Sequence, residues 1–225
     1  MADTLAQQAI ATQPYAPARA GQFGARLPQF DTVGATAYAS VEDRNIFYLV
    51  HKKTVPLRMN ILNILRRLRN NSIITLRDQH ILRINGEERL VSSLEMPLGP
   101  TFFTPDAIHA RPIADSHIRN VILPQMTDSL RAIHEFGLAH RSLHVGRLFY
   151  RDSGKSKIAI GECFSAPAGH SLPLSFETPE RALAQDGLRG EGRPADDFYA
   201  LGVVLLTLLT GRELQGGRTD GQLLQ

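Results

Sequence analysis

The residues with the most potential for chemistry lie in the second half of the chain. His140-Arg141-Ser142 follows a helix-like segment, and Gly161-Glu162-Cys163 follows a short β-prone run. A serine hydroxyl is no base near neutral pH unless a neighbouring group takes its proton. Cys163 is the only cysteine, which excludes an internal disulfide and a cysteine-rich zinc site. The histidines include no H-E-x-x-H motif, and the sequence predicts no metal site.

Two predicted helices and a pair of short strands position these residues. The first helix has an apolar face made of Ile118, Ile122, Met126, Leu130 and Ile133. Pro124 lies inside that pattern and indicates that the helix kinks or begins there. Residues 196–211 predict a second helix, which is buried, and short strands are expected near 149–150 and 157–160.

The first half predicts a small sheet that carries one helix. The predicted strands span 38–40, 46–50, 81–85 and 88–96. The dipeptide Asn85-Gly86 is typical of a tight hairpin turn between the last two. The predicted helix covers 57–70, where apolar residues recur at helical spacing among several arginines.

The second half resembles a protein-kinase catalytic domain in the order of its motifs. His140 to Leu143 resembles H-R-D-L, and Gly161-Glu162-Cys163 stands where kinases have D-F-G. Thr178-Pro179-Glu180 resembles A-P-E, and residues 197–203 resemble the D-x-W-S-x-G start of the large buried helix. The resemblance covers about residues 30–215 and is clear from about 118 onward.

This resemblance implies an α+β, bilobal protein-kinase-like fold. Residues 1–27 are then expected to be a flexible tail, and 28–97 a small, β-rich N-lobe with one helix. Residues 98–225 are expected to be a mainly helical C-lobe that is truncated after the large buried helix. Within it the resemblance makes four residues fold anchors: His140, Arg141, Glu180 and Asp197.

Several catalytic positions of the resembled motifs hold the wrong residue type. Kinase phosphoryl transfer uses an Asp that receives the substrate hydroxyl proton, and an Asp and an Asn that hold magnesium. The corresponding positions here are Ser142, Gly161 and Arg147. A guanidinium cannot ligate a cation, and its charge repels one. We therefore expect no catalytic residue at these degenerate positions.

The first lobe also departs from the kinase pattern. It has no G-x-G-x-x-G, and no acidic residue lies between Arg44 and Arg77 to pair with a strand lysine. Recognition of adenine through backbone groups survives such changes. If a nucleotide binds, Lys52, Glu95 and Met96 are the residues expected to contact it.

The leading hypothesis is a pseudokinase, a catalytically inactive domain that acts as a regulatory or protein-interaction module. It needs no cofactor, although ATP binding without catalysis stays open. The alternative is an atypical ATP-binding serine/threonine-type kinase or nucleotidyl/phosphotransferase in which Glu162 is a non-standard metal ligand.

Composition is consistent with an ordinary globular domain. The 225 residues are 43% hydrophobic and 21% charged, with a formal net charge of +3. That charge is too small to indicate nucleic-acid binding, and the most apolar run, 201–209, is too short to span a membrane. No secretory signal is visible. We expect a cytoplasmic protein with an unidentified protein partner.

Overall fold

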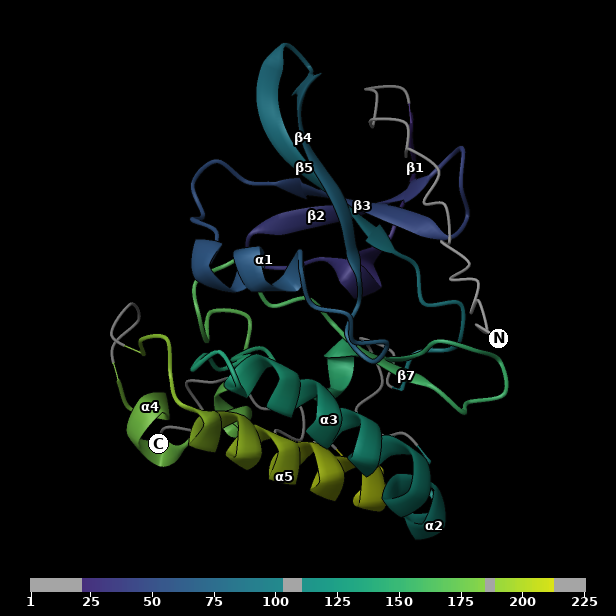
Figure 1. The fold of residues 1–225 in the computed structure, drawn as a ribbon, viewed down its shortest axis with the longest axis vertical. Helices are drawn as coiled ribbons and strands as arrows, with labels where there is room; N and C mark the ends of the chain where they lie inside the picture. Colours follow the sequence, from purple (N-terminus) through teal and green to yellow (C-terminus); the bar gives the residue numbers. More distant parts are fainter. Residues whose placement is uncertain (1–21, 103–110, 185–188, 213–225) are drawn as a thin grey trace, which may run out of the picture.

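The computed structural model describes residues 22–102, 111–184 and 189–212. A sheet with one helix beneath it forms one end of the molecule, and the longer helices form the other (Figure 1). Both lobes of the predicted α+β fold are therefore present in the expected order.

The N-lobe sheet has five antiparallel strands in the order β1-β2-β3-β5-β4. The strands are β1 (Phe23–Arg26), β2 (Ala35–Ser40), β3 (Ile46–His51), β4 (Leu76–Ile84) and β5 (Glu87–Glu95). Asn85 and Gly86 both have positive φ, 51° and 83°, as a two-residue hairpin turn requires. The predicted hairpin is confirmed.

The first strand corrects the predicted tail. Residues 23–26 were expected to be flexible, yet they pair with β2. The expectation is therefore wrong for residues 22–27, while residues 1–21 lie outside the described part of the chain. The segment FGAR has no β-branched residue, so nothing local to it predicts a strand.

Helix α1 (Met59–Leu65) is shorter than predicted and lies against the inner face of the sheet (Figure 1). It buries Ile61, Leu62 and Leu65. The preceding residue, Arg58, is the non-helical N-cap, and its backbone N–H donates to the carbonyl of Phe164 in the other lobe.

The first C-lobe helix is continuous from Asp115 to His134 but changes its winding. It consists of α2 (Asp115–His117), a π-helical turn η3 (Ile118–Ile122) and α3 (Leu123–His134). Proline has no N–H, and its ring clashes with the preceding turn of a regular helix. The wider turn directly before Pro124 relieves that clash, so the predicted irregularity takes the form of a π turn.

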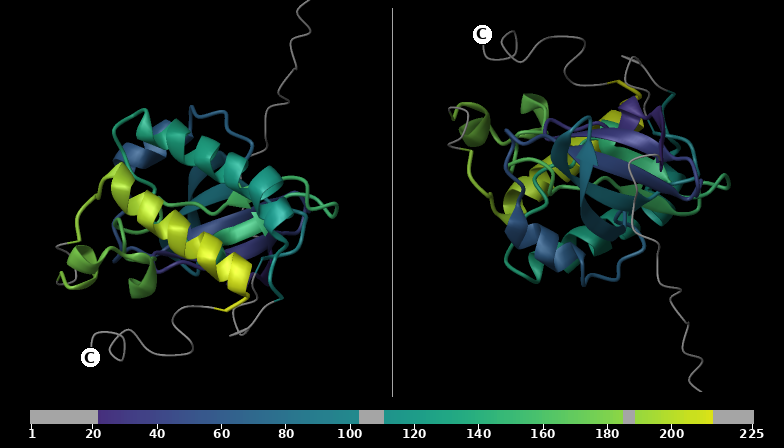
Figure 2. Two further views of the ribbon diagram at one scale, coloured as in Figure 1. Left: turned by 90° about the horizontal axis from the view of Figure 1, so that it is seen from below. Right: turned by 90° about the horizontal axis from the view of Figure 1, so that it is seen from above.

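Helix α5 (Pro194–Thr210) lies beside α3, as the view from below in Figure 2 shows. The short hairpin β6 (Leu148–Tyr150) and β7 (Ile158–Ile160) packs near them. Helix α4 (Pro179–Ala182) and the 3-10 turns η2 (Pro28–Phe30), η4 (Val145–Arg147) and η5 (Leu174–Phe176) complete the described elements. No helix in the described ranges is long and apolar enough to cross a membrane.

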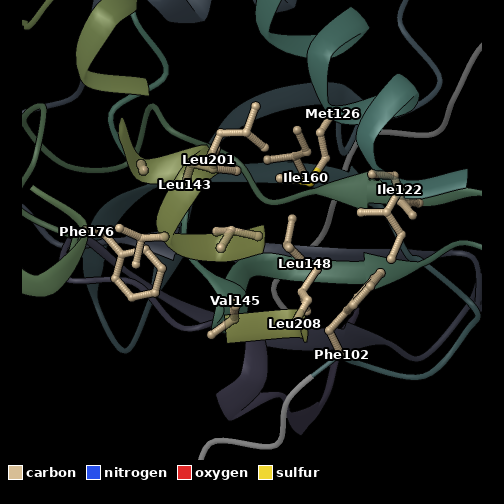
Figure 3. Packing of buried hydrophobic residues seen from close by; sticks show 14 of the residues in the cluster. Phe102, Ile122, Met126, Leu143, Val145, Leu148, Ile160, Phe176, Leu201 and Leu208 are labelled. Atoms are coloured by element: carbon tan, nitrogen blue, oxygen red, sulfur yellow. The ribbon is translucent and has the colours of Figure 1, made fainter. Parts of the chain in front are cut away.

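Two apolar cores hold the fold together. The C-lobe core joins α3, α5 and the β6–β7 hairpin, and Figure 3 shows Met126, Leu148 and Leu201 meeting in it. The second, which we call the inter-lobe core, joins the sheet and α1 to Phe149, Cys163 and Phe164 of the C-lobe. Because one core spans both lobes, the cleft between them contains packed side chains.

Gly202 in the middle of α5 provides a stability test of this fold. It is exposed, and a Cβ built there meets no atom within 4 Å. Glycine inside a helix costs about 0.5–1 kcal/mol relative to alanine. Gly202→Ala is therefore expected to raise the free energy of unfolding by about that amount in urea titrations. A decrease would mean that part of the chain outside the described residues packs on this face.

Candidate functional site: the cleft between the lobes

The loop that carries the H-R-D-L-like motif is fixed to α5 by Asp197. Its Oδ2 accepts the backbone N–H of His140 at 2.6 Å, and its Oδ1 accepts that of Arg141 at 2.8 Å. His134 Nε2 lies 2.7 Å from Oδ2. Burial works to raise the pKa of Asp197, but these hydrogen bonds and nearby His140 outweigh it and lower that pKa. This is the anchoring contact that the resemblance implies.

His140 is fully buried, and both of its ring nitrogens have partners. Its Nε2 lies 3.1 Å from the Gly161 carbonyl oxygen, and its Nδ1 accepts the backbone N–H of Ser142 at 3.2 Å. This pair of contacts assigns the neutral ring with the proton on Nε2. Burial lowers the pKa of His140 and keeps it in that form. The ring thus connects the H-R-D-L-like and D-F-G-like segments.

Arg141 forms a buried ion pair with Glu177. Its two terminal nitrogens lie 2.6 and 2.9 Å from the two carboxylate oxygens, and both side chains are 0% exposed. Glu180 was the expected acidic anchor, but it is exposed on α4. Glu177, three residues earlier, makes the buried contact to the motif arginine instead.

Arg58 links α1 to the cleft. It is 4% exposed, and all five of its N–H donors are used. They reach the carbonyl oxygens of Ala139, His140 and Cys163 and, twice, the carboxylate of Glu191. In this chain an arginine at the start of the helix, and not a helix glutamate, holds the two lobes in position.

The catalytic-Asp position has no activated group. Ser142 is buried, and its Oγ has no hydrogen-bond partner among the described residues. A hydroxyl without a neighbouring base is a poor nucleophile and cannot itself accept a proton from a substrate.

Arg147 stands at one of the two positions where the resemblance expects a metal ligand, and its side chain packs against the other, Gly161. A Cβ built on Gly161 would lie 3.2 Å from two carbons of the Arg147 side chain. A side chain at position 161 would therefore press on Arg147, which would have to shift by a few tenths of an ångström. Arg147 is 5% exposed, and burial lowers its pKa, with Glu162 and Asp31 acting in the opposite direction. Its guanidinium places a fixed positive charge near these two carboxylates.

Glu162 is engaged by its own turn. The side chain is buried, and Oε2 accepts the N–H groups of Phe164 and Ser165 at 2.8 and 3.0 Å. Oε1 accepts the Ser165 hydroxyl at 2.6 Å. Across the part of the chain that the structure describes, no three His, Cys, Asp or Glu residues gather in a way that could hold a metal ion.

The structure places Lys52 outside the cleft. The residue is exposed, and its Nζ donates to the Val33 carbonyl at 2.8 Å. Because side chains alternate along a strand, His51 points inward instead, with its Nε2 2.8 Å from the Ser92 hydroxyl and its ring near Phe164. Burial lowers the pKa of His51. The inward position expected to hold a lysine therefore holds a neutral histidine.

The two expected adenine-contacting residues, Glu95 and Met96, are engaged within the protein. Glu95 forms ion pairs with Arg77 and Arg151, each at 3.2 Å. The backbone N–H of Met96 donates to the Asn45 carbonyl at 2.7 Å. Burial raises the pKa of the nearby Cys163 thiol, consistent with an inert buried cysteine.

Three residues that shape the cleft were not predicted: Phe30, Arg58 and Glu177. Glu177 adjoins the A-P-E-like motif, so an acidic residue one position before it is a signal that could have been noticed. No pattern in the sequence near Arg58 or Phe30 indicates their roles, because both act through contacts with the other lobe.

Comparisons with known proteins agree with the motif resemblance. No protein-family profile matches the chain. Human serine/threonine-protein kinase H1 is 29% identical over 156 residues, which are 67% of this chain and 35% of that protein. Human serine/threonine-protein kinase H2 is 28% identical over 156 residues, covering 67% and 39%. The chain thus spans little more than a third of the length of these relatives.

Solved structures show the fold. Rad53 1-466 in complex with AMP-PNP superposes with a TM-score of 0.63 and 19% identity, covering 90% of this chain and 52% of that chain. The Drosophila melanogaster PAN3 pseudokinase superposes with a TM-score of 0.57 and 20% identity, covering 90% and 53%. With its motifs in kinase order, a two-lobed fold and serine/threonine kinases among its relatives, the chain is a member of the protein-kinase-like superfamily.

Proposed function

We propose that this chain is a catalytically inactive protein-kinase-like domain that acts as a regulatory or protein-interaction module. The observation that carries the proposal is the pairing of Arg147 with Gly161. Phosphoryl transfer depends on metal ions that neutralise charge on the phosphates. Here the buried side chain of Arg147 stands at one expected metal-ligand position and packs against the other, where a Cβ on Gly161 would lie 3.2 Å from its Cβ and Cδ.

The remaining catalytic positions support the same proposal. The Oγ of Ser142 has no hydrogen-bond partner among the described residues, and the inward residue at the end of β3 is His51 rather than a lysine. The contacts that organise the cleft, those of Arg58, Arg141 and Asp197, are structural and do not require a nucleotide. The fold itself does not decide the matter, because it is shared with a pseudokinase and with a protein solved with AMP-PNP.

The alternative enzyme would use Glu162 to bind a metal. Both of its oxygens already accept hydrogen bonds from the Phe164–Ser165 turn. Releasing them would leave two buried backbone N–H groups without partners, each at a cost of about 1–3 kcal/mol. We therefore favour the inactive domain, with no cofactor and with a protein as its partner.

The test is a phosphoryl-transfer assay with labelled ATP and magnesium or manganese, on the protein itself and on a generic protein substrate. We expect no transfer above the level of a heat-denatured sample. Glu162→Gln, which keeps the shape of the side chain, is the matched variant. Metal-dependent transfer that Glu162→Gln abolishes would establish the alternative enzyme, and transfer that survives this change would equally contradict inactivity.

A further inference from the structure

Three aromatic rings from different parts of the chain form one stack inside the cleft. Phe30 of η2 lies between Phe47 of β3 and Phe149 of β6. The ring centroids are 4.4 and 4.7 Å apart, and the rings are 24° and 30° from parallel. Phe30 is 4% exposed. The segment is visible as the purple turn between the sheet and the helical lobe in Figure 1.

The residues after Phe30 close against the opposite side of the cleft. The hydroxyl oxygens of Thr32 and Ser165 are 2.8 Å apart. The backbone of Gly34 is packed so closely that a Cβ built there would lie 1.7 Å from the Ser165 carbonyl oxygen. Only glycine fits at that position. The segment 27–34 therefore contacts the sheet, β6 and the turn that holds Glu162.

With Phe30 in this position, the apolar slot and the backbone group that a flat heteroaromatic ligand would use are already occupied. Such a ligand needs an apolar slot between two surfaces and a few polar backbone groups at its edge. Phe30 fills the slot between Phe47 and Phe149. Met96 packs at the edge of the same inter-lobe core, and its N–H is already bonded to the Asn45 carbonyl.

We propose that residues 27–34 are an internal ligand of the cleft, in which the Phe30 ring occupies the slot for a planar heteroaromatic group such as the base of a nucleotide. The proposal rests on the proposed function and adds one point to it. The cleft is filled by a segment of the chain itself, and the domain keeps this arrangement without a bound nucleotide. An intramolecular group competes at an effective concentration that free ligand has to exceed. Removing the ring should open the slot.

The experiment measures binding of a fluorescent ATP analogue, without metal, to the 225-residue chain and its variants. We expect no saturable binding to the wild type at millimolar concentrations, and at least tenfold tighter binding to Phe30→Ala. Phe23→Ala is the matched control. It removes the same side chain from a position where the ring packs on Tyr38 and Tyr48, in a cluster apart from the inter-lobe core, and should gain no binding.

Gly34→Ala is a second, independent variant, because it keeps the ring and forces the segment away from Ser165. It should also gain binding, and cooperative thermal unfolding shows that each variant is folded. Folded variants that bind no better than the wild type would overturn the proposal. Saturable binding to the wild type would overturn it whatever the variants do, and without phosphoryl transfer that result would leave the proposed function intact.

Discussion

Replacing Glu177 by glutamine is expected to lower the free energy of unfolding by about 3–5 kcal/mol, the usual cost of removing one partner of a buried ion pair. Arg141 would keep its charge, and its side chain is 0% exposed, so water cannot compensate for the lost carboxylate. The Nε of Arg141 already has no hydrogen-bond partner in the described structure, so the carboxylate of Glu177 is the main partner that the buried guanidinium would lose. Urea unfolding at neutral pH measures the change.

Glu180→Gln is the matched control for that measurement. Glu180 lies three residues further on and is exposed, so the same chemical change should alter stability by no more than about 0.5 kcal/mol. The double variant Arg141→Met, Glu177→Leu should be less destabilised than Glu177→Gln alone, because it leaves no unpaired charge in the interior. A loss below about 1 kcal/mol in Glu177→Gln would show that the guanidinium finds another partner.

The Arg141–Glu177 pair also bears on regulation. By resemblance, the arginine of this motif in active kinases contacts a phosphorylated residue of the activation segment. Here Glu177 supplies a permanent negative charge at hydrogen-bonding distance. The contact between this segment and the H-R-D-L-like loop therefore needs no added phosphate.

The fold was predictable because its signals are local or ordered along the chain. The hairpin turn at Asn85-Gly86 requires two residues that tolerate positive φ, and the sequence places Asn and Gly there. The motifs from His140 to Asp197 come in a recognisable order and mark their elements without any knowledge of contacts. Strand β1 was missed, because only its pairing with β2 makes FGAR a strand.

The sequence shows which kinase residue types are missing from the cleft motifs, but not what fills the cleft. Carboxylates are missing at positions 142 and 161, whereas the residues that organise the cleft do so through contacts that are distant in the sequence. Arg58 bonds Glu191 across 133 residues, and nothing near either residue indicates the pairing. Phe30 likewise stacks on a ring from the other lobe. Such contacts are set by the packing of two lobes, which no local pattern encodes.

Asp197→Asn is expected to destabilise the fold by about 1–3 kcal/mol, the usual cost of leaving a buried hydrogen-bond donor without its acceptor. The carboxylate accepts the N–H groups of His140 and Arg141 on separate oxygens. Asparagine has only one oxygen, so its NH2 group would face one of these buried donors. Asp128→Asn, on the exposed face of α3, is the control and should change stability by no more than about 0.5 kcal/mol.

The stability of the wild type and that of Asp197→Asn should also respond differently to acid. The pKa of Asp197 is lower folded than unfolded, so its contribution is complete above the unfolded value of about 3.9 and is lost as the pH falls through the folded pKa. Burial lowers the pKa values of His51 and His140, so below about pH 6.5 the unfolded state binds more protons at these rings than the folded state does. The free energy of unfolding of both proteins therefore decreases as the pH decreases. In urea titrations between about pH 4 and pH 3, the wild type should therefore lose stability faster than Asp197→Asn. Equal losses over that range would show that the ionised carboxylate does not anchor the loop.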